Sequence, residues 1–140
     1  MSEIVVGVDG SAPSKQALAW AADEAKRRGS TLRVVMAWDN PNKDMWIPRI
    51  RPGADHPLQL IEGALDRLVH EVLGRRPSVA IERVAVEGPP AKILVAQAKS
   101  ADLLVVGNRG HGGLTEALLG SVGQYCVRHA TCPVVIMRGK

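Results

Sequence analysis

Aromatic residues are scarce in this sequence, which has no phenylalanine, one tyrosine and three tryptophans among its 140 residues. Unpaired bases stack on aromatic side chains, so this scarcity disfavours a protein that binds single-stranded nucleic acid. Long apolar stretches are also missing, because none approaches the roughly 18 residues of a membrane-spanning helix. The first residues, MSEIVVGVDG, lack the basic region and apolar core of a signal peptide. We therefore expect neither a membrane span nor export.

Cysteine is scarce as well. The chain has two cysteines, Cys126 and Cys132, and neither belongs to a CxxC pair. Metal binding or redox chemistry through such a pair is therefore disfavoured. We expect two free thiols, which suit a reducing compartment and predict a cytoplasmic protein.

Charge of one sign is not concentrated in the sequence. The 18 lysines and arginines exceed the 14 aspartates and glutamates, which leaves a net charge of +4. The longest basic run, at residues 26–28, stands where a helix is expected to end, and cations there complement the helix dipole. A protein that binds nucleic acid normally gathers its basic residues on one face or in one run, so this class is disfavoured.

The sequence does contain a regular alternation of short β-branched runs and longer segments with helical periodicity. We expect strands at residues 3–9, 31–38, 79–86, 102–107 and 133–138, and helices at residues 11–29, 58–74, 89–100 and 121–130. Ser11 or Ser14 can cap the first helix, and Gly29 can end it. The connection at residues 39–57 carries four prolines and no periodicity. Such a segment often covers a site, and Trp46 within it is a candidate to do so.

This alternation predicts a single α/β domain over residues 1–140, with a five-stranded parallel sheet flanked by four helices. In such sheets, ligands bind at the carboxyl ends of the strands, where the strand order reverses. Three features stand at expected strand ends: Asp9 after the first strand, Ala37 at the end of the second, and the segment from Gly107 after the fourth. If the first and fourth strands are neighbours, these features lie around one crevice.

The segment at residues 107–121, GNRGHGGLTEALLGS, holds five of the 14 glycines within 15 positions. Because glycine has no Cβ, successive backbone N–H groups in such a loop can turn toward an anion. Ser121 stands where the N-cap of the following helix is expected, and a helix N-terminus favours phosphate. Alternatively, the glycines serve only tight turns and close packing of a helix on a strand. The density of glycine between a strand and a helix favours phosphate binding.

The spacing of these glycines excludes two well-known phosphate loops. No GxxxxGK[ST] sequence is present, so the segment is not a Walker A loop. GNRGHGG does not match GxGxxG, and it follows the fourth expected strand, whereas a dinucleotide fingerprint follows the first. The observed spacing is Gly107-x2-Gly110-x9-Gly120-Ser121.

With this spacing the chain resembles the universal stress protein family, whose ATP-binding members carry G-x2-G-x9-G-[S/T] after the fourth strand. The resemblance extends over the whole chain, through IVVGVDGS, EGPPAKIL, ADLLVVGNRGHGG, LLGSV and CPVVIMR. It implies a Rossmann-like (adenine nucleotide alpha hydrolase-like) sandwich with strand order 3-2-1-4-5, and ATP laid across the point where this order reverses. The implied function is a nucleotide-dependent stress-response or signalling module.

The resemblance also implies which residues contact the nucleotide. Asp9 should accept hydrogen bonds from the ribose hydroxyls, although Asp-Gly after a strand is also a turn signal. Gly7 and Ala37 match positions that hold adenine. The residues expected at the ribose and phosphates are Gly107, Gly110, Gly120, Ser121 and Val122. Arg109 and His111 lie inside the loop and either contact the phosphates or point to water. Mg²⁺ or Mn²⁺ is expected beside the phosphates, with no protein ligand assigned to it.

Two further expectations concern partners and activity. The last strand, at about 133–138, is apolar and is expected at a sheet edge, where pairing with a second copy covers exposed backbone groups. Members of the resembling family dimerise through this strand, which implies a homodimer. No catalytic constellation is evident, so we expect a binding protein with at most weak ATP hydrolysis. Two alternatives stay open: a slow ATPase or phosphotransferase that uses Asp9 or His111 with a metal, and a sensor of another adenine nucleotide such as cyclic AMP.

Overall fold

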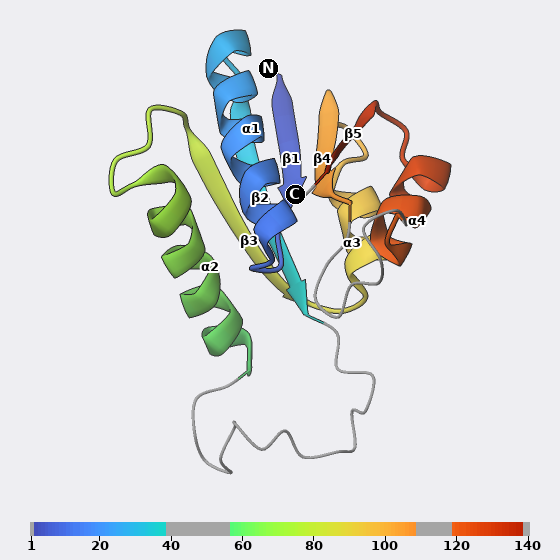
Figure 1. Ribbon diagram of the computed structural model, residues 1–140, viewed down its shortest axis with the longest axis horizontal. Coiled ribbons are helices and arrows are strands. Elements are labelled where there is room, and N and C mark those ends of the chain that lie inside the picture. The colour runs from blue at the N-terminus through green and yellow to red at the C-terminus, as the bar shows by residue number, and fades with distance from the viewer. Residues whose placement is uncertain (1, 39–56, 109–118, 139–140) are drawn as a thin grey trace.

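The structure is a computed structural model, and it describes residues 2–38, 57–108 and 119–138. Strands and helices alternate along this part of the chain (Figure 1). The strands are β1 (Glu3–Gly7), β2 (Thr31–Trp38), β3 (Ile81–Glu87), β4 (Leu103–Gly107) and β5 (Val134–Met137). The helices are α1 (Ala12–Arg28), α2 (Pro57–Leu73), α3 (Pro90–Gln97) and α4 (Ser121–His129).

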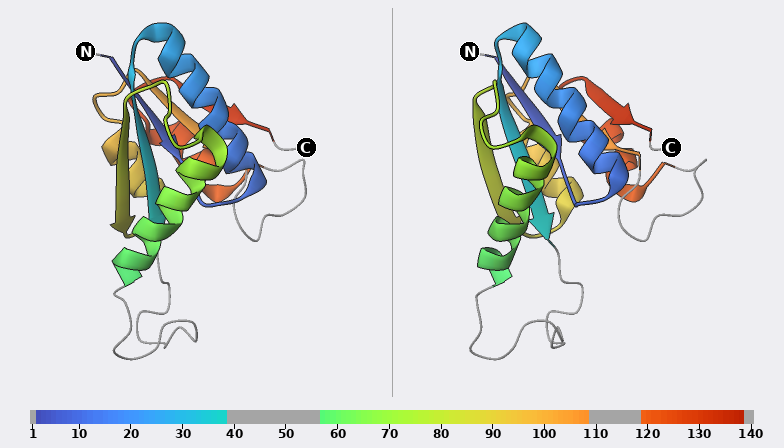
Figure 2. Two further views of the ribbon diagram at one scale, coloured as in Figure 1. Left: turned by 90° about the vertical axis from the view of Figure 1, so that its left-hand side faces the viewer. Right: turned by 60° about the vertical axis from the view of Figure 1, so that its left-hand side comes forward.

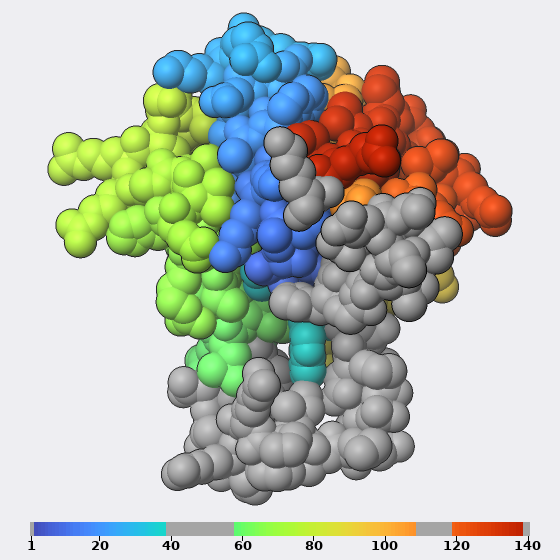
Figure 3. Space-filling model, in the orientation of Figure 1, coloured from blue at the N-terminus to red at the C-terminus, as the bar shows by residue number. Residues whose placement is uncertain are grey.

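The strands form one parallel sheet of order β3-β2-β1-β4-β5, which confirms the predicted fold class. From β1 the chain moves outward to β3, and it then returns to β4 on the other side of β1. The strand order therefore reverses between β1 and β4. Helices α1 and α2 cover one face of the sheet, and α3 and α4 cover the other (Figure 2). In the space-filling view, α1 runs between α2 on one side and the C-terminal elements on the other (Figure 3).

Each face of the sheet has its own hydrophobic core, because successive strand residues point to opposite faces. Along β1, Ile4 and Val6 belong to the core beneath α1 and α2, and Val5 belongs to the core beneath α3 and α4. The first core is completed by α1 and α2 residues that include Leu18 and Leu65. The central strands β1 and β4 are therefore buried on both sides, as their continuous apolar runs predict.

Local signals set both ends of α1. Ser11 is the N-cap of α1, where its hydroxyl oxygen accepts a hydrogen bond from the N–H of Ser14. Gly29 ends α1 with a positive φ of 66°, a conformation that glycine adopts without steric cost. The structure starts α2 at Pro57, one residue earlier than expected, and β1 ends at Gly7, two residues earlier than expected. Residues 39–56, including Trp46, lie outside the described residues.

An ion-pair network joins three strands at the edge of the sheet where the strands begin. The Arg33 guanidinium on β2 donates to Glu3 on β1 at 2.8 Å and to Glu82 on β3. It also donates at 3.2 Å to both the backbone carbonyl and the side-chain oxygen of Gln97 at the end of α3. These contacts link β2 to both neighbouring strands near the amino ends of the strands, opposite their carboxyl ends.

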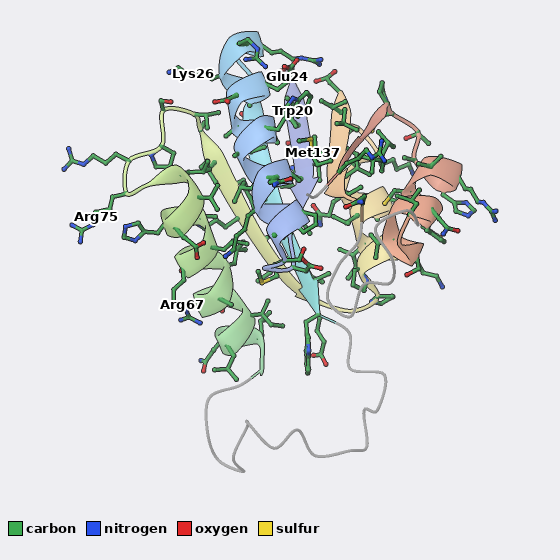
Figure 4. The ribbon with its side chains drawn as sticks, in the orientation of Figure 1. Trp20, Glu24, Lys26, Arg67, Arg75 and Met137 are labelled. Carbon is green, nitrogen blue, oxygen red and sulfur yellow. The ribbon has the colours of Figure 1, made fainter. Side chains whose placement is uncertain are left out.

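None of the helices that the structure describes is long and apolar enough to span a membrane. Charged side chains extend outward on this side of the molecule, such as Arg67 on α2 and Arg75 in the connection that follows it (Figure 4).

Candidate functional site

The candidate site lies at the carboxyl edge of the sheet, where β1 and β4 end side by side. The two strands are paired in register, with Ile4 opposite Leu103 and Val6 opposite Val105. The end of β4 at Gly107 therefore lies beside the segment that follows β1. Helix α1 begins at the same edge (Figure 1). The predicted adjacency of the first and fourth strands is therefore correct.

Asp9 is held by the first turn of α1. Its carboxylate Oδ1 accepts a 2.9 Å hydrogen bond from the N–H of Ser11, and its own N–H donates to the Ser14 hydroxyl at 3.3 Å. Ser14 in turn donates to the Ser11 carbonyl at 2.9 Å. Between them, Gly10 has a φ of 86°, which makes the reversal from β1 into α1. The turn reading of Asp-Gly is thus correct, and the same turn gives the Asp9 carboxylate a defined orientation.

Gly107 admits the first turn of α1 against the end of β4. A Cβ at this position would lie 2.9 Å from Pro13 Cβ, 3.1 Å from the Pro13 carbonyl carbon and 3.2 Å from the Ser14 nitrogen. The first distance is shorter than real Cβ atoms show, and the two backbone distances are tighter than nine in ten real Cβ contacts. The packing of a helix on a strand therefore already explains why this residue is glycine.

Gly7 has a similar packing role on the other face of the sheet. A Cβ there would lie 2.6 Å from Leu94 Cδ1 and 2.9 Å from Leu94 Cδ2. Leu94 is a buried residue of α3 in the second core. The missing side chain of Gly7 thus brings α3 against the end of β1.

Asn108 connects β4, β5 and the start of α4, and it was not among the site residues predicted from the sequence. It is 7% exposed, its N–H donates to the Met137 carbonyl at 2.8 Å, and its carbonyl accepts a 2.6 Å hydrogen bond from the N–H of Gly120. Residues 108 and 120 therefore lie side by side, at the two ends of a segment outside the described residues. Its position was the one feature of the sequence that could have indicated this role, because Asn108 is a polar residue directly after an apolar strand.

Helix α4 begins at Ser121, so the prediction of Ser121 as its N-cap is wrong by one residue. The N-cap is Gly120, with φ −65° and ψ 165°, and no side chain caps this end of the helix. The first turn is instead steadied by Gln124, whose side-chain amide donates to the Leu119 carbonyl at 2.6 Å. Val122 is partly buried against the second core. The chain around Gly120 is thus held by backbone contacts and leaves the helix N-terminus uncapped by a side chain.

Ala37 lies near the carboxyl end of β2, opposite Val86 of β3, and is partly buried. Gly7 pairs with Val35, so Ala37 stands two residues further along the neighbouring strand. This places it at the same edge of the sheet as Asp9. The remaining predicted contacts, Arg109, Gly110 and His111, lie outside the described residues.

The two cysteines are unpaired, and both have a raised pKa. Cys126 and Cys132 are free thiols, as predicted. Burial, with a contribution from Cys132, raises the pKa of Cys126 to about 11. Burial also raises the pKa of Cys132. Across residues 2–38, 57–108 and 119–138, no group of three or more His, Cys, Asp or Glu side chains is arranged to hold a metal ion.

The fold defines a Rossmann-like α/β protein, whose strand order reverses between β1 and β4. Residues 1–138 match the Universal stress protein family, and the chain belongs to that family. It is 39% identical over 143 residues to universal stress protein Rv2623 of Mycobacterium tuberculosis, a match that covers 96% of this chain and 44% of that protein. The chain thus spans less than half the length of this curated relative.

Two solved structures are similar over nearly the whole chain. One is a universal stress protein in complex with cAMP, with 30% identity, a TM-score of 0.66, and 99% and 98% of the two chains covered. The other is the universal stress protein from Archaeoglobus fulgidus in complex with dAMP, with 25% identity, a TM-score of 0.68, and 98% of each chain covered. Both of these proteins bind an adenine nucleotide.

Proposed function

We propose that this chain binds ATP at the carboxyl edge of its sheet and acts as a nucleotide-dependent stress-response module. One observation carries the proposal: a continuous series of contacts joins Asp9 to the N-terminus of α4. Asp9 bonds to Ser14, Ser14 packs against Gly107, and the next residue, Asn108, bonds to Gly120. A carboxylate and a helix N-terminus are thus held at fixed positions on the two sides of the strand-order reversal.

These two groups suit the two ends of a nucleotide. A carboxylate accepts hydrogen bonds from the two hydroxyls of a ribose, which is the role proposed for Asp9. The first turn of α4 presents backbone N–H groups and the positive end of the helix dipole, which favour phosphate oxygens. We assign the ribose to Asp9 and the phosphates to Gly120, Ser121 and Val122, and we place adenine toward Ala37.

Gly7 and Gly107 have a different role in this proposal from the direct nucleotide contacts expected from the sequence. Each has a packing contact that accounts for its missing side chain, with Leu94 and with Pro13 respectively. We therefore propose that they shape the site by bringing α3 and α1 close to it, with nucleotide contact limited to their backbone atoms. Gly110 keeps its proposed place at the phosphates on sequence grounds alone, and for Arg109 and His111 both alternatives, contact with the phosphates or exposure to water, stay open.

The test is calorimetric titration of the purified protein with ATP, ADP and AMP, after any co-purifying nucleotide has been identified and removed. We expect ATP to bind and Asp9→Ala to weaken it by at least about tenfold, since hydrogen bonds to a charged group contribute about 1.5–3 kcal/mol. Asp23→Ala is the matched control, because Asp23 is an exposed carboxylate further along α1. Equal affinity of the wild type and Asp9→Ala would contradict the assignment of the ribose.

Cyclic AMP is a second candidate ligand, because a family member 30% identical to this chain was solved with cAMP. A cyclic phosphate blocks the 3′ hydroxyl, so it offers Asp9 one ribose hydroxyl in place of two. Competition between ATP and cAMP for the purified protein distinguishes the candidates. Preference for cAMP would replace ATP as the proposed ligand while leaving the site in place.

We propose that Mg²⁺ or Mn²⁺ enters with the phosphates rather than occupying a protein-built site. The site has one carboxylate in its described part, Asp9, and phosphate oxygens are good ligands for these hard cations. We also expect bound ATP to stay intact over hours with magnesium, with at most weak hydrolysis. Steady release of ADP that depends on Asp9 would instead support the ATPase alternative.

We further propose a homodimer that pairs through β5. This strand is an edge of the described sheet, and its four residues are partly exposed. Beside it, Trp20 of α1 and Met137 of β5 are partly buried against the first core (Figure 4). Light scattering should give twice the chain mass of 15.0 kDa, and a mass of one chain at working concentration would contradict the proposal. The two free thiols support a reducing compartment such as the cytoplasm.

A further inference from the structure

Ser14 has an unusual position for a helical serine. It lies in the first turn of α1, is 3% exposed, and donates its hydroxyl hydrogen to the Ser11 carbonyl at 2.9 Å. That bond, to a carbonyl three residues earlier, is common for serine in helices. The second bond is different, because the same hydroxyl oxygen accepts the N–H of Asp9 at 3.3 Å, from a residue that precedes the helix.

The place of Ser14 is itself set by β4. Its backbone nitrogen would lie 3.2 Å from a Cβ at Gly107, so the turn that carries Ser14 is packed directly on the end of that strand. Pro13, the preceding residue, is also buried in this contact. The Ser14 hydroxyl is therefore a fixed point with respect to β4, where the segment toward Gly120 begins.

Asp9 stands directly before the turn that leads into α1. The next residue, Gly10, has a positive φ of 86°, and glycine is the residue with the greatest freedom to leave such a conformation. The Ser14 hydroxyl fixes the Asp9 backbone at its N–H, and the Ser11 N–H fixes the side chain at Oδ1. Both bonds come from the first turn of α1.

We propose that Ser14 is a positioning residue for the nucleotide site: it orients Asp9 toward the ribose and sets the distance from Asp9 to β4. The inference rests on the proposed binding of ATP, with Asp9 at the ribose hydroxyls. Ser14 does not contact the nucleotide. It acts through the Asp9 backbone: its loss removes the hydrogen bond at the Asp9 N–H, while the Ser11 N–H still bonds to Oδ1.

A purely structural role for Ser14 makes a different prediction, and Ser30 provides the comparison. Ser30 follows the other end of α1, is 5% exposed, and its hydroxyl pairs with the hydroxyl of Ser2. Ser14→Ala and Ser30→Ala thus remove equally buried, hydrogen-bonded hydroxyls from opposite ends of one helix. Both should lower the melting temperature, whereas only Ser14→Ala should change how the protein recognises ribose.

The experiment compares ATP with 2′,3′-dideoxy-ATP, which lacks both ribose hydroxyls, by calorimetric titration. In the wild type we expect ATP to bind at least about tenfold more tightly, the effect of hydrogen bonds to a carboxylate. Ser14→Ala should lower this ratio at least about twofold, toward the ratio in Asp9→Ala, since the Ser11 N–H still bonds to Oδ1. Ser30→Ala should keep the wild-type ratio. If Ser14→Ala fails to fold, Ser14→Cys takes its place. The thiol fills the same space but is a poor hydrogen-bonding group, so this variant should lower the ratio in the same way.

The outcomes separate the inference from the function on which it rests. A wild-type protein that binds no ATP contradicts the proposed function. A wild-type protein that binds both nucleotides equally retains ATP binding but removes Asp9 from the ribose, and with it the role of Ser14. A wild-type ratio preserved in Ser14→Ala and Ser14→Cys overturns the positioning role alone.

Discussion

Gly107 and Pro13 are packed so closely that a Cβ on the glycine would lie 2.9 Å from Pro13 Cβ. The contact joins the last residue of β4 to the first turn of α1. It brings together two segments that are distant in the sequence and that both border the strand-order reversal. The glycine that begins the predicted phosphate loop is therefore also a packing residue of the fold.

Gly107→Ala should destabilise the protein. The added methyl group meets backbone atoms of Pro13 and Ser14, which cannot move aside without displacing α1, and such overpacking typically costs about 1–3 kcal/mol. Chemical denaturation measures the change. Gly63→Ala is the control, since a Cβ there meets only the Arg67 side chain at 3.4 Å, and a helix-interior alanine should stabilise by about 0.5–1 kcal/mol. A Gly107→Ala variant as stable as wild type would show that α1 adjusts freely.

Gly120→Val should weaken ATP binding and leave the fold intact. The backbone at Gly120 has φ −65° and ψ 165°, an extended conformation that a β-branched residue adopts readily. The isopropyl group would stand at the N-terminus of α4, where phosphate is proposed to approach, and we expect at least about a tenfold loss of affinity. Titration with ATP measures this loss, and circular dichroism follows the fold. Val127→Ala, at an exposed position of the same helix, should bind as wild type does. Undiminished affinity in Gly120→Val would remove the helix N-terminus from the site.

Arg33→Met should destabilise the protein without changing its affinity for ATP. Glu3, Glu82 and Gln97 would lose a shared partner that is about one-fifth exposed, and we expect a cost of about 1–3 kcal/mol, between that of surface and buried ion pairs. Arg67→Met, at an exposed position of α2, should stay within about 0.5 kcal/mol of wild type. Reduced ATP affinity in a folded Arg33→Met protein would contradict this prediction. It would show that the amino ends of the strands are coupled to the proposed site at their carboxyl ends.

Cys126 should make the protein less stable at high pH. Its pKa is raised by burial to about 11, from 9.0 for an ordinary thiol, so the unfolded chain loses this proton at a lower pH than the folded one. The unfolded state then binds fewer protons, and the free energy of unfolding falls as the pH rises from 9 to 11, by about 2 kcal/mol. The contribution is fully present below pH 9. Denaturation of wild type and Cys126→Ala across this range isolates the effect, because the other titrating groups are common to both proteins. Parallel pH profiles would contradict it.

The order of the elements and the class of fold could be predicted from the sequence. Apolar runs bounded by Gly29 and Gly74 marked the ends of α1 and α2, and both glycines have the positive φ that such ends require. The alternation of strands and helices then predicted the parallel sheet. These features are local, because propensity, periodicity and helix caps depend on residues within a few positions of each other.

The packing contacts of individual residues near the candidate site could not be predicted from the sequence. Gly7 and Gly107 pack against Leu94 and Pro13, which lie tens of residues away in the chain. Asn108, which joins β5 to the start of α4, carried no recognised motif. The N-cap of α4 moved from Ser121 to Gly120 as well. Such contacts depend on how helices pack on the sheet, and a spacing of glycines is the same whether the absent side chain makes room for a ligand or for a neighbouring helix.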